Sequence, residues 1–147
     1  MQVAYHARYD RGIAAPFHPD LETLAAWADD LLLCVPGGDA TRGMIDARIL
    51  RALGPKGTPV NVAWGSVTNE KDLIAALTHR WIASAGLDVL ATEPQVNPRL
   101  TPLLNVTMMP HHASGTAKAR EAMARRMVGN LITHFDGLPL LSQVPLR

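Results

Sequence analysis

The chain has 147 residues, 48% of them hydrophobic, and this length and composition predict one compact domain with its own core. Its 14 basic and 13 acidic side chains give a formal net charge of +1, so no basic excess is present to neutralise a nucleic-acid backbone. No apolar run approaches the roughly 18 residues of a membrane helix, and no signal-type segment is recognisable. We therefore expect a cytoplasmic protein without a nucleic-acid or membrane partner.

The first half of the chain alternates apolar runs with amphipathic stretches that begin at helix-capping residues. Residues 3–6 are the first predicted strand, and Asp20 caps a predicted helix over residues 21–28. A buried strand is predicted at residues 31–35. It contains the single cysteine, Cys34, for which we expect a buried thiol and no disulfide.

The alternation continues to the end of the chain. Asp46 caps a predicted helix that ends at Leu53, and a Gly-Pro-Lys-Gly turn then leads into a strand at residues 60–63. Asn69 starts the next helix. Further strands are predicted at residues 82–89 and 106–109, and a long helix from about Thr116 to Phe135.

This βα order predicts an α/β fold with a mainly parallel sheet, right-handed crossovers and helices on each side. Ligands of such sheets bind at the carboxyl ends of the strands. The residues that follow the predicted strands are Arg8, residues 35–38, Trp64, Gly65, Asp88 and His111.

Three other motifs carry little weight. Residues 54–58 have the composition of a phosphate-binding loop, but they precede a strand, which favours a turn. The six histidines and one cysteine show no H-x-x-x-H or C-x-x-C spacing, so we expect no metal site. Ser66 and Ser114 lie in no G-x-S-x-G elbow.

Four segments resemble one family in the right order. Residues 60–67, Val-Asn-Val-Ala-Trp-Gly-Ser-Val, are similar to a segment in which N-x-A is followed by arginine and glycine, with Trp64 in the arginine's place. Residues 86–94 carry G-L-D-V and E-P, residues 110–116 resemble P-H-x-[GA]-S-x-T, and residues 135–140 match F-x-G-x-P-L. Together they resemble the D-isomer-specific 2-hydroxyacid dehydrogenases, especially the glyoxylate/hydroxypyruvate reductase branch.

The resemblance implies a Rossmann-like, mostly parallel, doubly wound NAD(P)-binding domain. In that family a hydride moves between the nicotinamide and C2 of a small 2-keto or 2-hydroxy acid. The resemblance makes His111 the proton carrier and Glu93 its carboxylate partner. Trp64 replaces the arginine that binds the substrate carboxylate, and a neutral indole cannot supply that charged fork.

The resemblance also implies a set of cofactor-binding residues. They are Arg8, Val35, Pro36, Thr41, Ala63, Asp88, His111 and Ala113. Arg8 after the first strand favours NADP, because arginine accommodates a 2′-phosphate. Asp10 could bind a ribose 2′-hydroxyl instead, so NAD stays an alternative.

Parts of the family pattern are missing. No G-x-G-x-x-G occurs, so the first strand and its glycine loop are expected to be absent from a single partial domain over residues 1–147, as is a substrate domain. Strands 3–6 and 31–35 would then pair with each other, bind another chain, as in a homodimer, or leave the fold marginally stable. We expect the chain to be an impaired or inactive dehydrogenase; the alternative is a non-catalytic remnant that serves as a dimerising or interaction module.

Overall fold

The computed structural model describes residues 1–144 and divides the chain into two units. Unit 1 is Met1–Pro110, and unit 2 is His111–Arg147. Within the described residues, unit 1 holds a parallel sheet with three α-helices, and unit 2 holds one long helix. None of the helices among residues 1–144 is long and apolar enough to cross a membrane.

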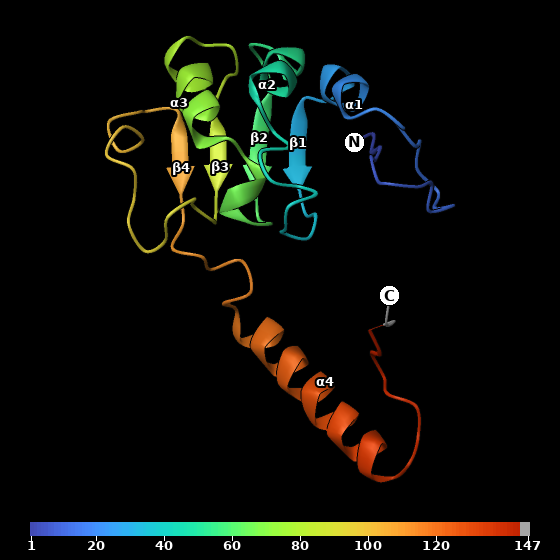
Figure 1. The fold of residues 1–147 in the computed structure, drawn as a ribbon. Helices are drawn as coiled ribbons and strands as arrows, with labels where there is room; N and C mark the ends of the chain where they lie inside the picture. Colours follow the sequence, from blue (N-terminus) through green and yellow to red (C-terminus); the bar gives the residue numbers. More distant parts are fainter. Residues whose placement is uncertain (145–147) are drawn as a thin grey trace. The chain divides into compact units, whose positions relative to one another are not determined.

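Unit 1 is built on a four-stranded parallel sheet (Figure 1). Its strands are β1 (Asp30–Leu33), β2 (Thr58–Asn61), β3 (Ala85–Leu87) and β4 (Val106–Met108), in the spatial order β1-β2-β3-β4. Each strand pairs in parallel with the next one in the chain. The expected Rossmann-like parallel architecture is confirmed, with strands shorter than the apolar runs that predicted them.

The helices of unit 1 begin where local chemistry predicts. They are α1 (Leu21–Trp27), α2 (Ala47–Leu53) and α3 (Glu70–Thr78), and a 3₁₀ turn, η1, covers Gly65–Val67. The side chains of Asp20, Asp46 and Asn69 each accept a hydrogen bond from a backbone N–H two or three residues further on. These bonds satisfy otherwise unpaired amides of the first turn, so all three predicted caps are confirmed.

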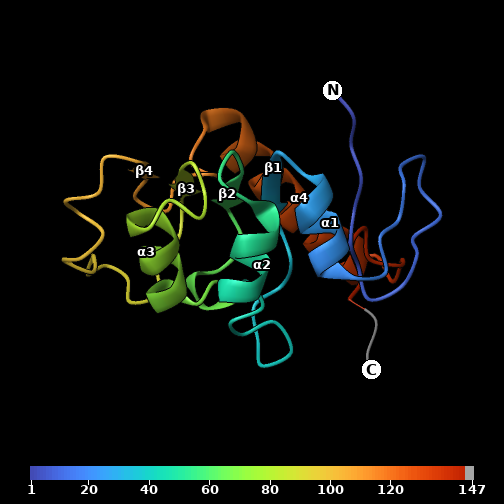
Figure 2. The same cartoon turned by 90° about the horizontal axis from the view of Figure 1, so that it is seen from above.

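The three helices lie on one face of the sheet (Figure 2). Right-handed crossovers keep to one face when the strand order runs in a single direction, as it does here. Because α4 belongs to unit 2, the expectation of helices on each side of the sheet stays a prediction. The apolar runs correctly predicted strands, but they could not predict the spatial order of those strands in the sheet.

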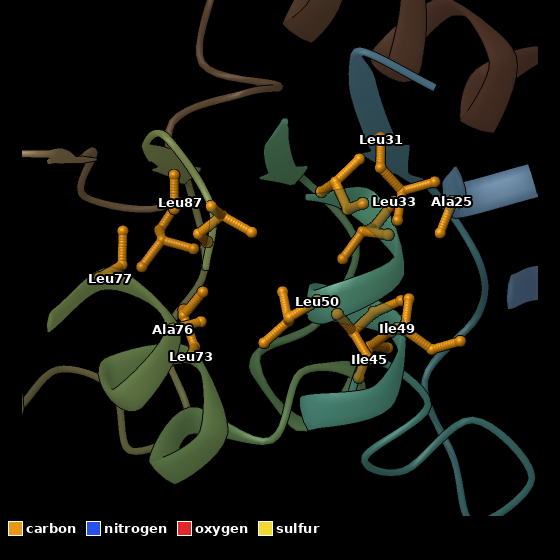
Figure 3. Packing of buried hydrophobic residues seen from close by; sticks show 14 of the residues in the cluster. Ala25, Leu31, Leu33, Ile45, Ile49, Leu50, Leu73, Ala76, Leu77 and Leu87 are labelled. Atoms are coloured by element: carbon orange, nitrogen blue, oxygen red, sulfur yellow. The ribbon is translucent and has the colours of Figure 1, made fainter. Parts of the chain in front are cut away.

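The core of unit 1 fills the space between these helices and the sheet (Figure 3). Its buried residues include Ala25, Leu31, Leu33, Ile45, Ile49, Leu50, Leu73, Ala76, Leu77 and Leu87. Along β1 burial alternates, so Leu32 on the other face is 59% exposed. Cys34 shares that outward parity and is exposed, which corrects the expectation of a buried thiol.

The predicted strand at residues 3–6 does not join the sheet. Tyr5 forms a single parallel bridge with Phe17, and its backbone N–H and carbonyl bond to Pro16 and His18. Of the three alternatives for this segment, the structure contradicts pairing with residues 31–35, since loop residues satisfy Tyr5 instead. Binding of another chain and marginal stability stay predictions. β1 is an edge strand within the described residues.

Unit 2 contains the predicted long helix, α4 (Ala117–Phe135). The hydroxyl of Thr116 accepts from the N–H of Ala119 at 3.1 Å and caps the first turn. Gly137 follows the helix with a φ of 69°, a conformation that glycine adopts without strain. No residue of α4 is buried.

Candidate active site at the carboxyl edge of the sheet

The loops that follow β1, β2 and β3 meet around the pair Trp64–Gly65. A Cβ added at Gly65 would lie 2.0 Å from the carbonyl oxygen of Leu90, so the backbones after β2 and β3 are in direct contact. A Cβ added at Gly37 would lie 2.7 Å from Cγ of Trp64. The indole therefore packs against the backbone of the loop after β1, and two glycines permit both approaches.

The loop after β1 holds three of the predicted cofactor residues, Val35, Pro36 and Thr41. The hydroxyl of Thr41 donates to the carbonyl of Pro36 at 2.7 Å, and its N–H donates to the carbonyl of Gly38 at 3.1 Å. A Cβ added at Gly38 would meet no atom within 4 Å. Thr41 thus closes the loop on itself, and open space lies beside Gly38.

A buried amide sets the backbone between β2 and η1. Asn61 is 2% exposed; its side-chain nitrogen donates to the Trp64 carbonyl at 3.0 Å and to Thr68 Oγ1 at 3.2 Å. Its side-chain oxygen accepts from the N–H of Ala63 at 3.0 Å. The same side chain therefore holds two predicted site residues, Ala63 and Trp64, in place.

Two predicted carboxylates follow β3. Asp88 is 9% exposed, and its backbone N–H donates to the carbonyl of Asn61 at 2.9 Å. Glu93 is exposed, and its side chain accepts from the N–H of Leu90 at 2.8 Å. Leu90 is the residue that contacts Gly65, so the Glu93 loop is tied to the same corner of the sheet.

Arg8 lies in the exposed N-terminal segment. Asp10, the residue that could oppose it in cofactor choice, accepts hydrogen bonds from the Tyr5 hydroxyl and from the N–H of Gly12. These bonds favour the ionised carboxylate and lower the pKa of Asp10 below its ordinary value. The Asp10 carboxylate is therefore committed to local contacts, whereas Arg8 is placed on the surface.

His111 and Ala113 belong to unit 2. His111 has a φ of 53°, in the left-handed region that non-glycine residues adopt infrequently. Such conformations cluster at functional sites. The pairing of His111 with Glu93, which lies in unit 1, stays a prediction.

The structure assembles part of the predicted site and adds residues that sequence reasoning missed. Val35, Pro36, Thr41, Ala63, Trp64, Asp88 and Glu93 all lie at the carboxyl edge of unit 1. Gly37 and Asn61 were missed as supporting residues. The N-x-A spacing was a signal for Asn61, but nothing local to Gly37 indicates a ring 27 positions further on. Within residues 1–144, no group of three or more His, Cys, Asp or Glu side chains could hold a metal.

Comparison with known proteins agrees with this geometry. Residues 1–113 match the family described as D-isomer specific 2-hydroxyacid dehydrogenase, NAD binding domain. The chain is 44% identical over 147 residues to a 2-ketogluconate reductase of Gluconobacter oxydans, covering 98% of this chain and 47% of that protein. It is 40% identical over 132 residues to a glyoxylate/hydroxypyruvate reductase of Arabidopsis thaliana, covering 90% and 42%.

Solved structures give the same result. An NADPH-dependent glyoxylate/hydroxypyruvate reductase of Sinorhizobium meliloti, in complex with NADP and malonate, superimposes with a TM-score of 0.88 at 40% identity, covering 97% of this chain and 45% of that one. The holo form of a D-mandelate dehydrogenase from Rhodotorula graminis reaches 0.91 at 29% identity, covering 99% and 44%. The chain spans about half the length of the curated relatives it matches. This chain belongs to the D-isomer-specific 2-hydroxyacid dehydrogenase family, and most of it corresponds to the family's NAD-binding domain.

Proposed function

We propose that this chain binds NADP or NAD at the carboxyl edge of unit 1 and derives from a dehydrogenase of small 2-keto and 2-hydroxy acids. The observation that carries the proposal is the meeting of three strand-end loops at Trp64–Gly65. Asp88 and Glu93 lie on that same edge, after β3. This is the edge at which parallel α/β sheets bind their ligands.

The residues present suit part of a dinucleotide. The loop closed by Thr41 and Pro36 offers backbone beside the open space at Gly38, which suits the adenosine side. Asp88, at the end of β3, can accept a hydrogen bond from the carboxamide of a nicotinamide. The glycine loop that cradles a diphosphate is not among these 147 residues, so we expect a polypeptide of residues 1–147 to bind weakly.

NADP is the preferred cofactor in this proposal. Arg8 supplies a guanidinium for a 2′-phosphate, whereas the Asp10 carboxylate is engaged by Tyr5 and Gly12. The relative from Sinorhizobium meliloti is described as NADPH-dependent. Both observations support a phosphate-binding role for Arg8.

The chemistry assigned to the chain's own residues is proton transfer and orientation. The bound cofactor supplies or accepts the hydride. His111 holds the proton that passes to or from the substrate oxygen, because imidazole exchanges protons near neutral pH. Glu93 orients that ring and favours its charged form.

Trp64 limits this activity. The family's arginine holds the substrate carboxylate by two charge-assisted hydrogen bonds, whereas an indole offers one neutral N–H donor. Losing a buried charged pair costs about 2–5 kcal/mol, or roughly 30-fold to several thousand-fold in rate if the loss is felt in the transition state. We therefore expect little turnover of 2-keto acids.

Calorimetric titration of the 147-residue chain with NADPH and with NADH tests cofactor binding. We expect NADPH to bind more tightly than NADH and Arg8→Ala to reduce the difference. Arg99→Ala removes another exposed arginine, in the loop before β4, and is the control that should bind like the parent chain. Absence of binding at millimolar cofactor would contradict the proposal.

A turnover assay with glyoxylate or hydroxypyruvate and NADPH tests the limit set by Trp64. We expect a rate well below that of an ordinary family member, and a rate within tenfold of it would show that Trp64 is compatible with efficient catalysis. Trp64→Arg alone should restore little activity to residues 1–147, because the diphosphate cradle is still missing from this polypeptide.

A second candidate function is supported by unit 2. An open groove of about 810 Å³ runs along α4 and is lined by Ala122, Met123, Arg126, Met127, Asn130, Leu131, His134 and Leu140. Apolar surface of this extent on a helix without a buried face favours association with another polypeptide. The second candidate function is therefore that of a dimerising or interaction module, with a homodimer as the simplest assembly.

A further inference from the structure

Trp64 combines a fixed backbone with an exposed ring, which is an unusual pairing for a large aromatic side chain. The side chain of Asn61 and the N–H of Val67 both donate to the Trp64 carbonyl, each at 3.0 Å. Asn61 is almost completely buried, yet Trp64 is 57% exposed. The ring is thus presented to solvent from a rigid base at the carboxyl edge.

One face of the indole is already occupied. A Cβ added at Gly37 would lie 2.7 Å from Cγ, 2.9 Å from Cδ1 and 2.9 Å from Cδ2 of Trp64. Three adjacent ring atoms at nearly equal distances mean that Gly37 approaches the face of the ring and not its edge. Gly37 therefore covers part of one face of the indole, and Trp64 is still 57% exposed despite this contact.

The indole itself and the loop that carries Gly37 offer little to a small anion. The indole is neutral, and in the loop that carries Gly37 the guanidinium of Arg42 lies 3.6 Å from the carboxylate of Asp39. A planar apolar group, by contrast, can stack on the exposed part of the indole, and this contact removes apolar surface of both rings from water.

From these observations we propose that Trp64 is the stacking surface of a binding site for aromatic carbonyl compounds, uncharged at the end that faces residue 64. This inference rests on the proposed function, since it concerns the substrate of the same edge. It assigns to Trp64 a new ligand class in place of the small anionic 2-keto acids.

Three related probes separate ring recognition from anion recognition. Acetophenone is an uncharged aryl ketone, benzoylformate is the same aryl ketone with a carboxylate, and glyoxylate is the small anion without a ring. Binding is followed by the indole N–H resonance of Trp64 in heteronuclear NMR spectra, assigned as the signal that Trp64→Phe removes. The chain has three tryptophans, so the other two signals report unspecific effects.

We expect acetophenone to shift the Trp64 signal saturably and to bind at least roughly tenfold more tightly than glyoxylate. Benzoylformate should bind less tightly than acetophenone. Trp64→Arg should reverse both preferences. Trp27→Phe is the matched control, because Trp27 is also exposed but ends α1 at the opposite edge of the sheet, just before β1. That variant should keep the parent's order of affinities.

Two results would overturn the inference: glyoxylate binding as tightly as acetophenone, or acetophenone shifting all three indole signals alike. Titration with NADPH of the same sample separates this inference from the proposed function. NADPH binding without a Trp64 response to acetophenone removes only the stacking site. A saturable Trp64 response without NADPH binding removes only the cofactor proposal.

Discussion

Asn61 shows how one buried polar side chain organises the candidate site. Its side-chain amide makes three hydrogen bonds, to Ala63, Trp64 and Thr68, in the segment that leads from β2 into and past η1. A buried amide is stable only when its polar atoms are paired, and in turn each partner depends on it. Asn61 is therefore a positioning residue for Trp64 and a structural residue for unit 1.

Replacing this residue tests both roles. Asn61→Ala should lower the free energy of unfolding by about 2–4 kcal/mol, because it removes three hydrogen bonds and leaves partly buried groups unpaired. Urea unfolding followed by circular dichroism measures the loss. In the folded variant, the indole N–H signal of Trp64 should broaden. A loss below about 1 kcal/mol with an unchanged Trp64 signal would mean that the contact with Gly37 and the bond from the N–H of Val67 hold Trp64 without Asn61.

Tyr5 and Asp10 make the stability of the N-terminal segment sensitive to pH. Partial burial and the hydrogen bond to Asp10 raise the pKa of Tyr5 above its ordinary value of 10.0. The hydrogen bonds from Tyr5 and from the N–H of Gly12 lower the pKa of Asp10 below its ordinary value of 3.8. The two residues therefore stabilise the segment most strongly between these ordinary values.

The direction of the pH dependence follows from linkage. The contribution of Asp10 is present above pH 3.8 and is lost as the pH falls through its lowered folded pKa. The contribution of Tyr5 is present below pH 10.0 and is lost as the pH rises through its raised folded pKa. NMR titration of both side chains measures these values. Tyr5→Phe should raise the pKa of Asp10 toward normal, and an unchanged value would show that the Tyr5 hydrogen bond is unimportant.

At the scale of elements, sequence patterns succeeded where the chemistry is local. The capping residues predicted helix starts within a residue, since a cap depends only on the three residues that follow it. The Gly-Pro-Lys-Gly turn is also confirmed, by the bond from the N–H of Gly57 to the carbonyl of Gly54. Strand bounds were less accurate, because an apolar run can continue past the last paired residue.

α4 offers a test of how much its cap contributes. Thr116→Ala removes the bond to the N–H of Ala119, and no buried face of α4 compensates. We expect a loss of about 1 kcal/mol in helix stability and frayed first turns. Amide hydrogen exchange of residues 117–121 measures the effect. Thr116→Ser keeps the hydroxyl and should restore protection; equal exchange in both variants would show that the cap is dispensable.

At the scale of the whole molecule, the sequence predicted the parallel architecture but not that α1, α2 and α3 all lie on one face of the sheet. Both faces of β1 are apolar in sequence, yet only Leu31 and Leu33 meet helices, whereas Leu32 and Cys34 face outward. Periodicity identifies a strand but not its neighbours. The same limit applies to the site: the motifs predicted Trp64 and Glu93, while the contact with Gly37 depends on a fold that brings distant loops together.

Association through α4 is the prediction that belongs to this scale. Met123, Met127 and Leu131 follow one another at four-residue spacing, and each is more than half exposed. If this stripe binds a second copy, Met127→Lys should shift the chain toward monomer in analytical ultracentrifugation. Lys118→Ala, at the start of the same helix, is the control. A parent chain that is monomeric at every concentration would exclude the homodimer.

The strand order of unit 1 also bears on how the protein acquires its structure. Since every strand pairs with the next one along the chain, each new strand can add to a sheet edge that earlier residues have already formed. No strand has to wait for a distant partner before it pairs, which keeps loop-closure costs small. During synthesis, β1 and α2 can offer β2 a partner while later residues are still being made, so unit 1 is suited to growth by sequential addition.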